Sequence, residues 1–253
     1  MEFFDSHSHY NDEKYDLDRD QIIDTIYKEG ITRTVCVGYN VDQSKQAIEI
    51  AEKYHNMYAT CGISPNDIED FVDNNLNIIE KIARNDKVVA IGEIGLDYYW
   101  NKDNKEKQKE LFIKQIEIAN RLNKPIVIHT RDAAVDTIEI LKQYPVNKKG
   151  IFHCCPLNQE LIKEGLKLGF YISFSGNITF KNAKSEACVG LVPMDKILIE
   201  TDCPYLSPEP YRGKRNDSTK VKLVAEKIAQ IKGMPLEAVA KQTYENANFI
   251  FNI

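Results

Sequence analysis

Six side chains that could bind metal ions are spread along the 253-residue chain but stand in similar local settings. Each ends or closely follows a short apolar run, and the set comprises His7, His9, Glu93, His129, His153 and Asp202. Imidazole and carboxylate groups are ligands for Zn²⁺, Mn²⁺ and Mg²⁺. The remaining histidine, His55, stands in a segment with helical spacing, and we interpret it as a surface residue.

The first two histidines are separated by one residue, in the segment Asp5-Ser6-His7-Ser8-His9. Side chains at positions i and i+2 of a strand project to the same face, so His7 and His9 can bind one ion together. Six ligands exceed the usual protein share of one ion. Two ions bridged by a carboxylate fit better, and Glu93 is the natural bridge. Paired ions about 3.5–4 Å apart are typical of sites that hydrolyse phosphate esters.

Eight short runs rich in apolar and β-branched residues have the character of strands that are buried on both faces. They cover residues 3–9, 32–37, 57–61, 88–93, 125–129, 150–154, 170–174 and 196–200. Between and after them lie segments with helical spacing of apolar residues. These cover residues 17–29, 41–54, 105–122, 135–144, 158–168, 219–231 and 235–251.

Strands that alternate with helices predict a parallel sheet with crossover helices. An open doubly wound sheet and a (β/α)₈ barrel both satisfy this pattern. Eight strands in about 250 residues favour the barrel, and no G-x-G-x-x-G segment follows the first strand. We therefore expect an α/β protein with one TIM-type barrel domain over residues 1–253. The carboxyl ends of its strands, with the six candidate ligands, converge on one rim, where the active sites of barrel enzymes lie.

Composition excludes several other classes of protein. Hydrophobic residues make up 43% and charged residues 28%, which is typical of a globular chain rather than a disordered or fibrous one. No apolar run approaches the roughly 20 residues that span a bilayer, and the N-terminus lacks a secretory signal, so we expect a cytoplasmic protein. The six cysteines form no C-x-x-C pair and are expected to be reduced and buried. The net charge of −5 argues against broad coating of a polyanion.

A local basic cluster follows the last candidate ligand. The segment covering residues 204–216 contains Arg212, Lys214 and Arg215, and it follows Asp202 closely enough to lie over the same rim. Arginine can hold a phosphate group through two parallel hydrogen bonds. Arg212 and Arg215 are therefore candidate contacts to an anionic substrate.

Together these residues resemble the TatD family of metal-dependent deoxyribonucleases, a branch of the amidohydrolase-like barrels, over nearly the whole chain. The matching segments cover residues 5–9, 91–99, 124–133, 173–181, 200–206 and 212–216. The resemblance implies that one divalent ion is bound by His7, His9, Glu93 and Asp202. It implies that the second ion is bound by Glu93, His129 and His153. It also implies a 3′-to-5′ exonuclease activity on DNA.

Two segments depart from the family pattern. The family usually has Gly-x-His-Pro after the third strand, whereas this chain has Gly62-Ile63-Ser64-Pro65, so substrate preference or rate is expected to differ. After His153 the family continues with an aromatic and small polar residues, whereas this chain has Cys154-Cys155-Pro156. A thiolate there would favour a softer ion such as Zn²⁺.

The expected reaction is phosphodiester hydrolysis at the 3′ end of DNA, with RNA also open, supported by two divalent ions (Mg²⁺, Mn²⁺ or Zn²⁺) per chain. Asp202 is expected to act as a ligand and as the proton acceptor for water. One alternative is an amidohydrolase-type enzyme that cleaves C–N or ester bonds. Many such barrels use a carboxylated lysine as the bridge, and Glu93 occupies that place here. A second alternative is a non-catalytic barrel. Nothing in the sequence indicates a membrane or an obligate protein partner.

Overall fold

The computed structural model describes residues 1–100 and 102–253. The described residues contain eight strands, and each pairs in parallel with the next strand along the chain. The strands are β1 (Phe3–Ser8), β2 (Ile31–Val37), β3 (Met57–Cys61), β4 (Val88–Asp97), β5 (Ile126–Arg131), β6 (Gly150–Phe152), β7 (Tyr171–Phe174) and β8 (Ile197–Ile199). Parallel neighbours need a crossover, because the chain must return to the start of the sheet before each new strand.

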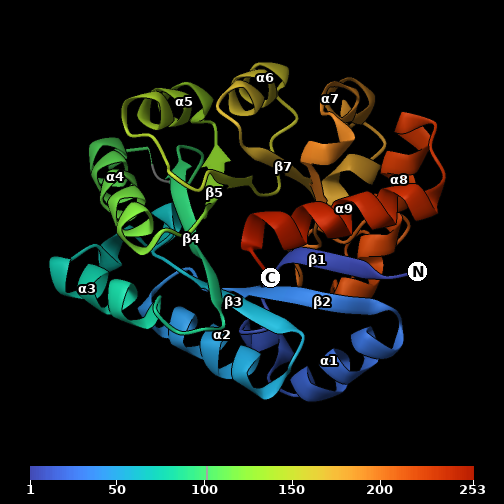
Figure 1. The fold of residues 1–253 in the computed structure, drawn as a ribbon, viewed down its shortest axis with the longest axis horizontal. Helices are drawn as coiled ribbons and strands as arrows, with labels where there is room; N and C mark the ends of the chain where they lie inside the picture. Colours follow the sequence, from blue (N-terminus) through green and yellow to red (C-terminus); the bar gives the residue numbers. More distant parts are fainter. Residues whose placement is uncertain (101) are drawn as a thin grey trace.

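Helices supply these crossovers and surround the sheet (Figure 1). The crossover helices are α1 (Arg19–Lys28), α2 (Val41–Lys53), α3 (Asp73–Ile82), α4 (Lys105–Leu122), α5 (Ala134–Gln143), α6 (Gln159–Lys167) and α7 (Ser185–Leu191). Helix α8 (Val221–Lys232) follows the last strand. The last helix, α9 (Leu236–Phe251), lies across one end of the sheet instead of beside it.

The sheet closes on itself where β8 meets β1. Ser8 forms an isolated parallel bridge with Cys203, and the backbone N–H of His9 donates to the Cys203 carbonyl at 2.7 Å. The Ser6 hydroxyl also donates to the carbonyl of Ile199 at 3.0 Å. The predicted (β/α)₈ barrel is therefore confirmed.

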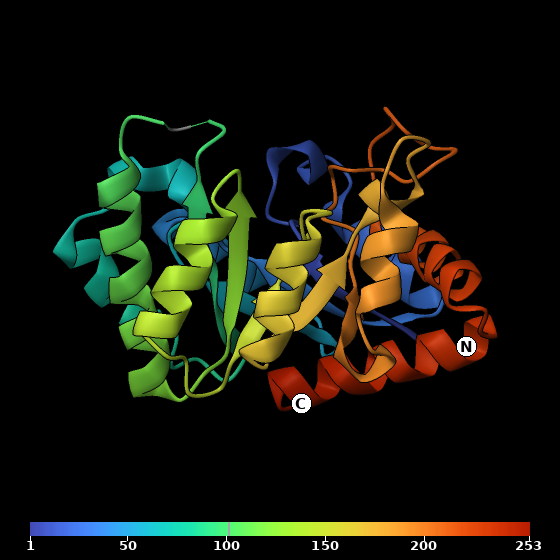
Figure 2. The same cartoon turned by 90° about the horizontal axis from the view of Figure 1, so that it is seen from above.

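Two clusters of buried apolar side chains stabilise the barrel. The larger cluster lies between the strands and the surrounding helices. The smaller one fills the barrel interior with residues such as Phe4, Val127 and Leu198, and it includes Phe251 from α9. Each fully buried large side chain contributes about 1.5–3 kcal/mol. Helix α9 therefore seals one end of the barrel, and in Figure 2 the loops that follow the strands lie along the opposite edge.

The predicted element boundaries differ from the structure at two informative places. Strand β4 continues to Asp97, so the prediction that it ends at Glu93 was wrong; pairing with β5 extends to Asp97 and Arg131. Helices α3 and α7 were not among the helices predicted from the sequence. Helix α7 has only seven residues and includes Gly190, so its periodic signal is weak.

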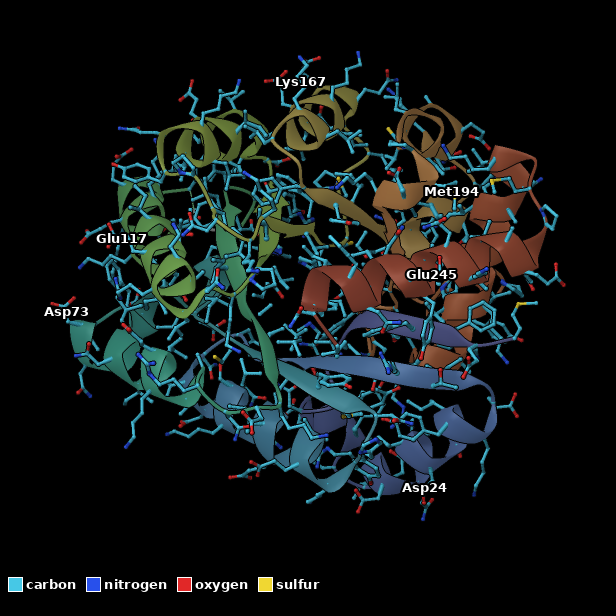
Figure 3. The ribbon with its side chains drawn as sticks, in the orientation of Figure 1. Asp24, Asp73, Glu117, Lys167, Met194 and Glu245 are labelled. Atoms are coloured by element: carbon cyan, nitrogen blue, oxygen red, sulfur yellow. The ribbon has the colours of Figure 1, made fainter. Side chains whose placement is uncertain are left out.

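Charged side chains such as Asp24, Asp73 and Lys167 lie on the outer rim of the molecule (Figure 3). This matches helices with one apolar face toward the sheet and one polar face toward water. Among the helices of the described residues, none has the length and apolar character needed to cross a bilayer.

Candidate metal centre

Glu93 lies at the centre of the six predicted ligands, and its two carboxylate oxygens face different partners. Its Oε2 atom lies 3.5 Å from His7 Nε2 and 3.9 Å from His9 Nε2. Its Oε1 atom lies 2.9 Å from His129 Nδ1 and 3.4 Å from His153 Nε2. The side chain is 9% exposed. One carboxylate thus separates two groups of nitrogen ligands.

Asp202 completes the first group. Its Oδ1 atom lies 3.6 Å from His7 Nε2 and 3.3 Å from His9 Nε2, and these two nitrogens lie 3.1 Å apart. The ligand atoms of His7, His9 and Glu93 are thus close enough to one another to hold one ion, and Asp202, from the segment after β8, lies beside the two histidine nitrogens. This arrangement matches the ligand set that the resemblance implies for the first cation.

The second group comes from neighbouring strands. His129 lies in β5 and His153 directly follows β6, and their facing nitrogens lie 3.3 Å apart. With Glu93 Oε1 they form a second set of three ligand atoms close enough to hold an ion. The structure therefore brings together all six predicted ligands in two sets that share Glu93.

Hydrogen bonds on the far side of two imidazoles fix which nitrogen can bind a cation. His9 Nδ1 lies 3.1 Å from the carbonyl of Val37, which can only accept, so this nitrogen donates. His129 Nε2 lies 2.9 Å from the Asp97 carboxylate and donates to it. When the rings are neutral, His9 Nε2 presents its lone pair to Asp202 and Glu93, and His129 Nδ1 presents its lone pair to Glu93. A nitrogen that faces a carboxylate needs either its own proton, which it then donates to the carboxylate, or a cation between the two groups, so the donor set fits divalent ions.

The acidic ligands are held ionised. Burial alone would raise the pKa of Glu93, but the positive charge of His153 and a hydrogen bond with His129 hold that pKa well below its ordinary value. Burial likewise opposes ionisation of Asp202, but the hydrogen bond with His9 and the positive charges of the neighbouring histidines together outweigh burial and lower the pKa. Both residues are therefore carboxylates at neutral pH, as metal ligands must be.

The pKa values of the histidines shift in different directions, according to the groups beside them. Burial acts to lower the pKa of His9 and of His129, but contacts with the carboxylates of Asp202 and Asp97 reverse the direction, and both pKa values are raised. His7 is fully buried, and this burial lowers its pKa. The cluster thus attracts positive charge to the space around Glu93.

Irregular backbone positions the ligands. The register between β1 and β2 shifts between Asp5 and Ser8, beside His7, and that between β4 and β5 shifts between Ile91 and Ile94, beside Glu93. Such shifts re-aim side chains relative to strict alternation along a strand.

Two residues that the sequence analysis did not assign support the ligands. Asp97, at the end of β4, holds His129 as described above. Glu200 is fully buried and lies 3.5 Å from His153 Nδ1, and its Oε1 atom accepts a hydrogen bond from the backbone N–H of Cys154 at 2.5 Å. Together with His7 and His153, Glu200 forms a further group of possible ligand atoms. Buried acidic residues at the ends of β4 and β8 were the signal that could have identified both.

The ligands lie at the bottom of a pocket of about 750 Å³. Its walls are built from the ends of β4 and β5 and from the segments that follow β1, β3, β4, β6, β7 and β8. The lining residues include Asn66, Trp100, Arg131, Cys154 and Tyr205. The pocket is therefore open above the two ligand sets, with aromatic and basic side chains around them.

The predicted substrate contacts lie outside this pocket lining. Arg215 pairs with Asp18 at 2.5 Å and donates to the carbonyl of Lys14, while the exposed Arg212 packs over the ring of Phe180 at 4.4 Å. Their contact with substrate stays a prediction.

Three further sequence interpretations can be placed. The Cys154 residue lines the pocket, and burial raises the pKa of its thiol well above the ordinary value, which favours the neutral thiol over the thiolate; its influence on the choice of ion stays a prediction. Ser64 is buried and its hydroxyl accepts a hydrogen bond from the backbone of Asn66, which caps the turn after β3. His55 is exposed in the turn after α2, as predicted for a surface residue.

Comparison with known proteins adds independent findings. The model of the family described as TatD related DNase matches residues 4–252. An uncharacterized metal-dependent hydrolase, YabD of Bacillus subtilis, is 45% identical over 252 residues, with 99% of each chain covered. The human deoxyribonuclease TATDN3 is 29% identical, with 98% of this chain and 93% of that protein covered. The solved structure of YJJV, a TatD homologue from Escherichia coli, superposes with a TM-score of 0.95 at 24% identity, covering 99% and 98% of the two chains.

Proposed function

This chain belongs to the TatD-related family of metal-dependent hydrolases, and on that premise we propose that it is a 3′-to-5′ exodeoxyribonuclease with two divalent ions per chain. The observation that carries the proposal is the sharing of Glu93 between two sets of ligand atoms. Paired ions bridged in this way suit displacement at phosphorus. The name of the human relative, a deoxyribonuclease, supports DNA as the substrate. The direction of cleavage rests on the family resemblance.

When bound, the two ions would lower the pKa of water and neutralise charge on the non-bridging phosphate oxygens. His7, His9, Glu93 and Asp202 would hold one ion, and Glu93, His129 and His153 the other.

Asp202 combines two features that suit a proton acceptor. Its carboxylate is ionised because of its contact with His9, and its side chain is 16% exposed toward the pocket, more than that of Glu93. It would orient the attacking water and take its proton as the oxygen bonds to phosphorus and the bond to the leaving oxygen breaks. Arg212, exposed on the loop after β8, would contact a neighbouring phosphate; Arg215 would first have to release Asp18.

The test uses a 5′-labelled single-stranded DNA oligonucleotide with Mg²⁺, Mn²⁺ or Zn²⁺ added separately, and with chelator. We expect a ladder that shortens from the 3′ end only when a divalent ion is present. An RNA oligonucleotide of the same sequence tests the sugar preference. Absence of cleavage with every ion, together with turnover of an amide or lactone panel, would replace the nuclease by a C–N or ester hydrolase.

Asp202→Asn is the matched test of the proton acceptor. The substitution keeps shape but removes the charge, and we expect cleavage to fall about 100-fold or more because general base catalysis contributes 10²–10⁴-fold. Asp24→Asn, the same chemical change on the outer face of α1, is the control and should leave the rate unchanged. An Asp202→Asn rate near that of the control would remove Asp202 from this role.

A further inference from the structure

Two adjacent aromatic side chains stand exposed beside the metal centre. Trp100 is 66% exposed and Tyr99 is 47% exposed, and their ring centroids lie 4.8 Å apart in an edge-to-face arrangement. The guanidinium of Arg131 lies 3.8 Å from the Tyr99 ring centroid and 5.5 Å from that of Trp100. Trp100 and Arg131 also line the pocket above Glu93. An aromatic surface that packs against the Arg131 guanidinium therefore borders the site of the proposed reaction.

This aromatic surface is held in place by the same carboxylate that orients a metal ligand. One oxygen of Asp97 accepts hydrogen bonds from the backbone N–H groups of Tyr99 and Trp100, at 2.9 and 3.0 Å. The other oxygen accepts from His129 Nε2 at 2.9 Å. The Gln108 side chain fixes the backbone N–H and carbonyl of Asp97 in turn. The position of the indole is therefore coupled to the metal ligands through one buried residue.

Another exposed aromatic residue of the pocket, Tyr205, is already engaged. Its hydroxyl donates to Asp12 Oδ2 at 2.6 Å, and the ammonium group of Lys14 lies 4.0 Å from the centre of its ring. A flat ligand could stack on the face that the lysine covers only by displacing the lysine. The Trp100 indole offers more free surface, because two-thirds of the residue is exposed.

We propose that Trp100, supported by Tyr99 and Arg131, is a stacking platform for an unpaired nucleobase of the substrate. The proposal rests on the nuclease function proposed above and deepens it by naming the substrate class. Every base has a flat π face, so stacking on an indole accepts any sequence but requires a base that has left the duplex. The enzyme is therefore specific for single-stranded or frayed 3′ ends, and Arg131 adds a cationic contact near the phosphate chain.

The chain supplies its own probe, because Trp100 is the only tryptophan in the sequence. The protein with Mg²⁺ is titrated with a short oligothymidylate whose phosphorothioate linkages resist cleavage, and indole emission is recorded. Anisotropy of a 5′ fluorescein on a separate sample of the oligomer reports binding independently. We expect saturable quenching at the concentrations that give binding. An abasic oligomer of equal charge should bind more weakly and leave the emission unchanged.

Substitution separates stacking from general attraction. Trp100→Ala should weaken oligothymidylate binding roughly 10-fold or more, within the range measured for one base–aromatic stack, and should remove the preference over the abasic oligomer. Trp100→Phe should retain most of that preference because a ring remains. Phe249→Ala is the matched control, since Phe249 is an aromatic residue 77% exposed on α9, at the sealed end of the barrel.

The outcomes distinguish the two proposals. Metal-dependent DNA cleavage together with binding that leaves indole emission unchanged, or with equal affinity of Trp100→Ala and the parent protein, would overturn the platform and leave the nuclease standing. Absence of both binding and cleavage for every oligonucleotide would overturn the nuclease, and the platform with it. Equal cleavage of a blunt duplex and a single strand would contradict the inferred preference for unpaired ends.

Discussion

Asp97 offers the sharpest test of how the second ligand set is organised. Its carboxylate accepts hydrogen bonds on both oxygens, from His129 on one side and from two backbone N–H groups on the other. Asp97→Asn has nearly the same shape but only one acceptor oxygen. The two backbone donors can pair only with an acceptor, whereas His129 can change its tautomer. We therefore expect the new amide group to face His129.

This orientation of the amide would place the His129 proton on the nitrogen that is needed to bind the ion. When the amide donates to His129 Nε2, the ring must carry its proton on Nδ1, which lies 2.9 Å from Glu93 Oε1. This nitrogen then donates to Glu93 and can no longer bind an ion without losing that proton. Loss of a supporting partner of this kind typically costs 10–100-fold in metal affinity. That range corresponds to about 1.4–2.8 kcal/mol.

The assay is a competition titration of the metal-free protein against a chromophoric chelator with Zn²⁺ or Mn²⁺. We expect the affinity for one of the two ions to fall 10–100-fold in Asp97→Asn, while thermal unfolding remains cooperative. Asp136→Asn is the control, because Asp136 accepts a hydrogen bond from Tyr98 and pairs with Lys109 but contacts no ligand. Affinities for both ions within two-fold of the parent protein would refute the assigned role of Asp97.

Two other predictions concern the barrel itself. A methyl group at Gly95 would lie 2.0 Å from the carbonyl oxygen of His129, in a residue with φ of +140°, so Gly95→Ala should lower the free energy of unfolding by about 2–4 kcal/mol. Gly190, in helix α7, has open space around it, so Gly190→Ala should be neutral or stabilising. Equal denaturation midpoints for the two variants would contradict the predicted clash. Burial raises the pKa of Cys36 and of Cys203 to about 12, so iodoacetamide at pH 8 should label them roughly a thousand-fold more slowly than in the unfolded chain. The folded state keeps these protons while the unfolded chain loses them above about pH 9, so the thiols do not affect the free energy of unfolding below that pH and lower it as the pH rises toward 12. Rapid labelling, or a free energy of unfolding that stays constant over this range, would contradict the burial of the two thiols.

Much of the site was accessible from the sequence because its signals are local. A parallel strand buried on both faces is a short apolar run, and the residues near its carboxyl end lie on one rim of a barrel whatever the details of packing. His7, His9, His129 and His153 therefore stood out by position, and the His-x-His spacing placed two of them on one face. The eight strands followed from the same alternation of apolar runs and helical periods.

Other features depend on contacts between distant segments, which no local pattern encodes. The sequence placed Glu93 at a strand end, but β4 continues four residues further, so that Asp97 reaches both His129 and the backbone of Trp100. Arg215 looked available for phosphate, yet it pairs with Asp18, nearly 200 positions away along the chain.

The chain by itself thus determined which residue types gather at one end of the barrel, because strand direction and apolar patterning are written locally. Only the tertiary structure decided how Glu93 divides its two oxygens between the ligand sets, which tautomers His9 and His129 adopt and which side chains are left free for a substrate. Those outcomes depend on hydrogen bonds of about 3 Å between residues tens of positions apart, and such distances are fixed only when all eight strands close into one barrel.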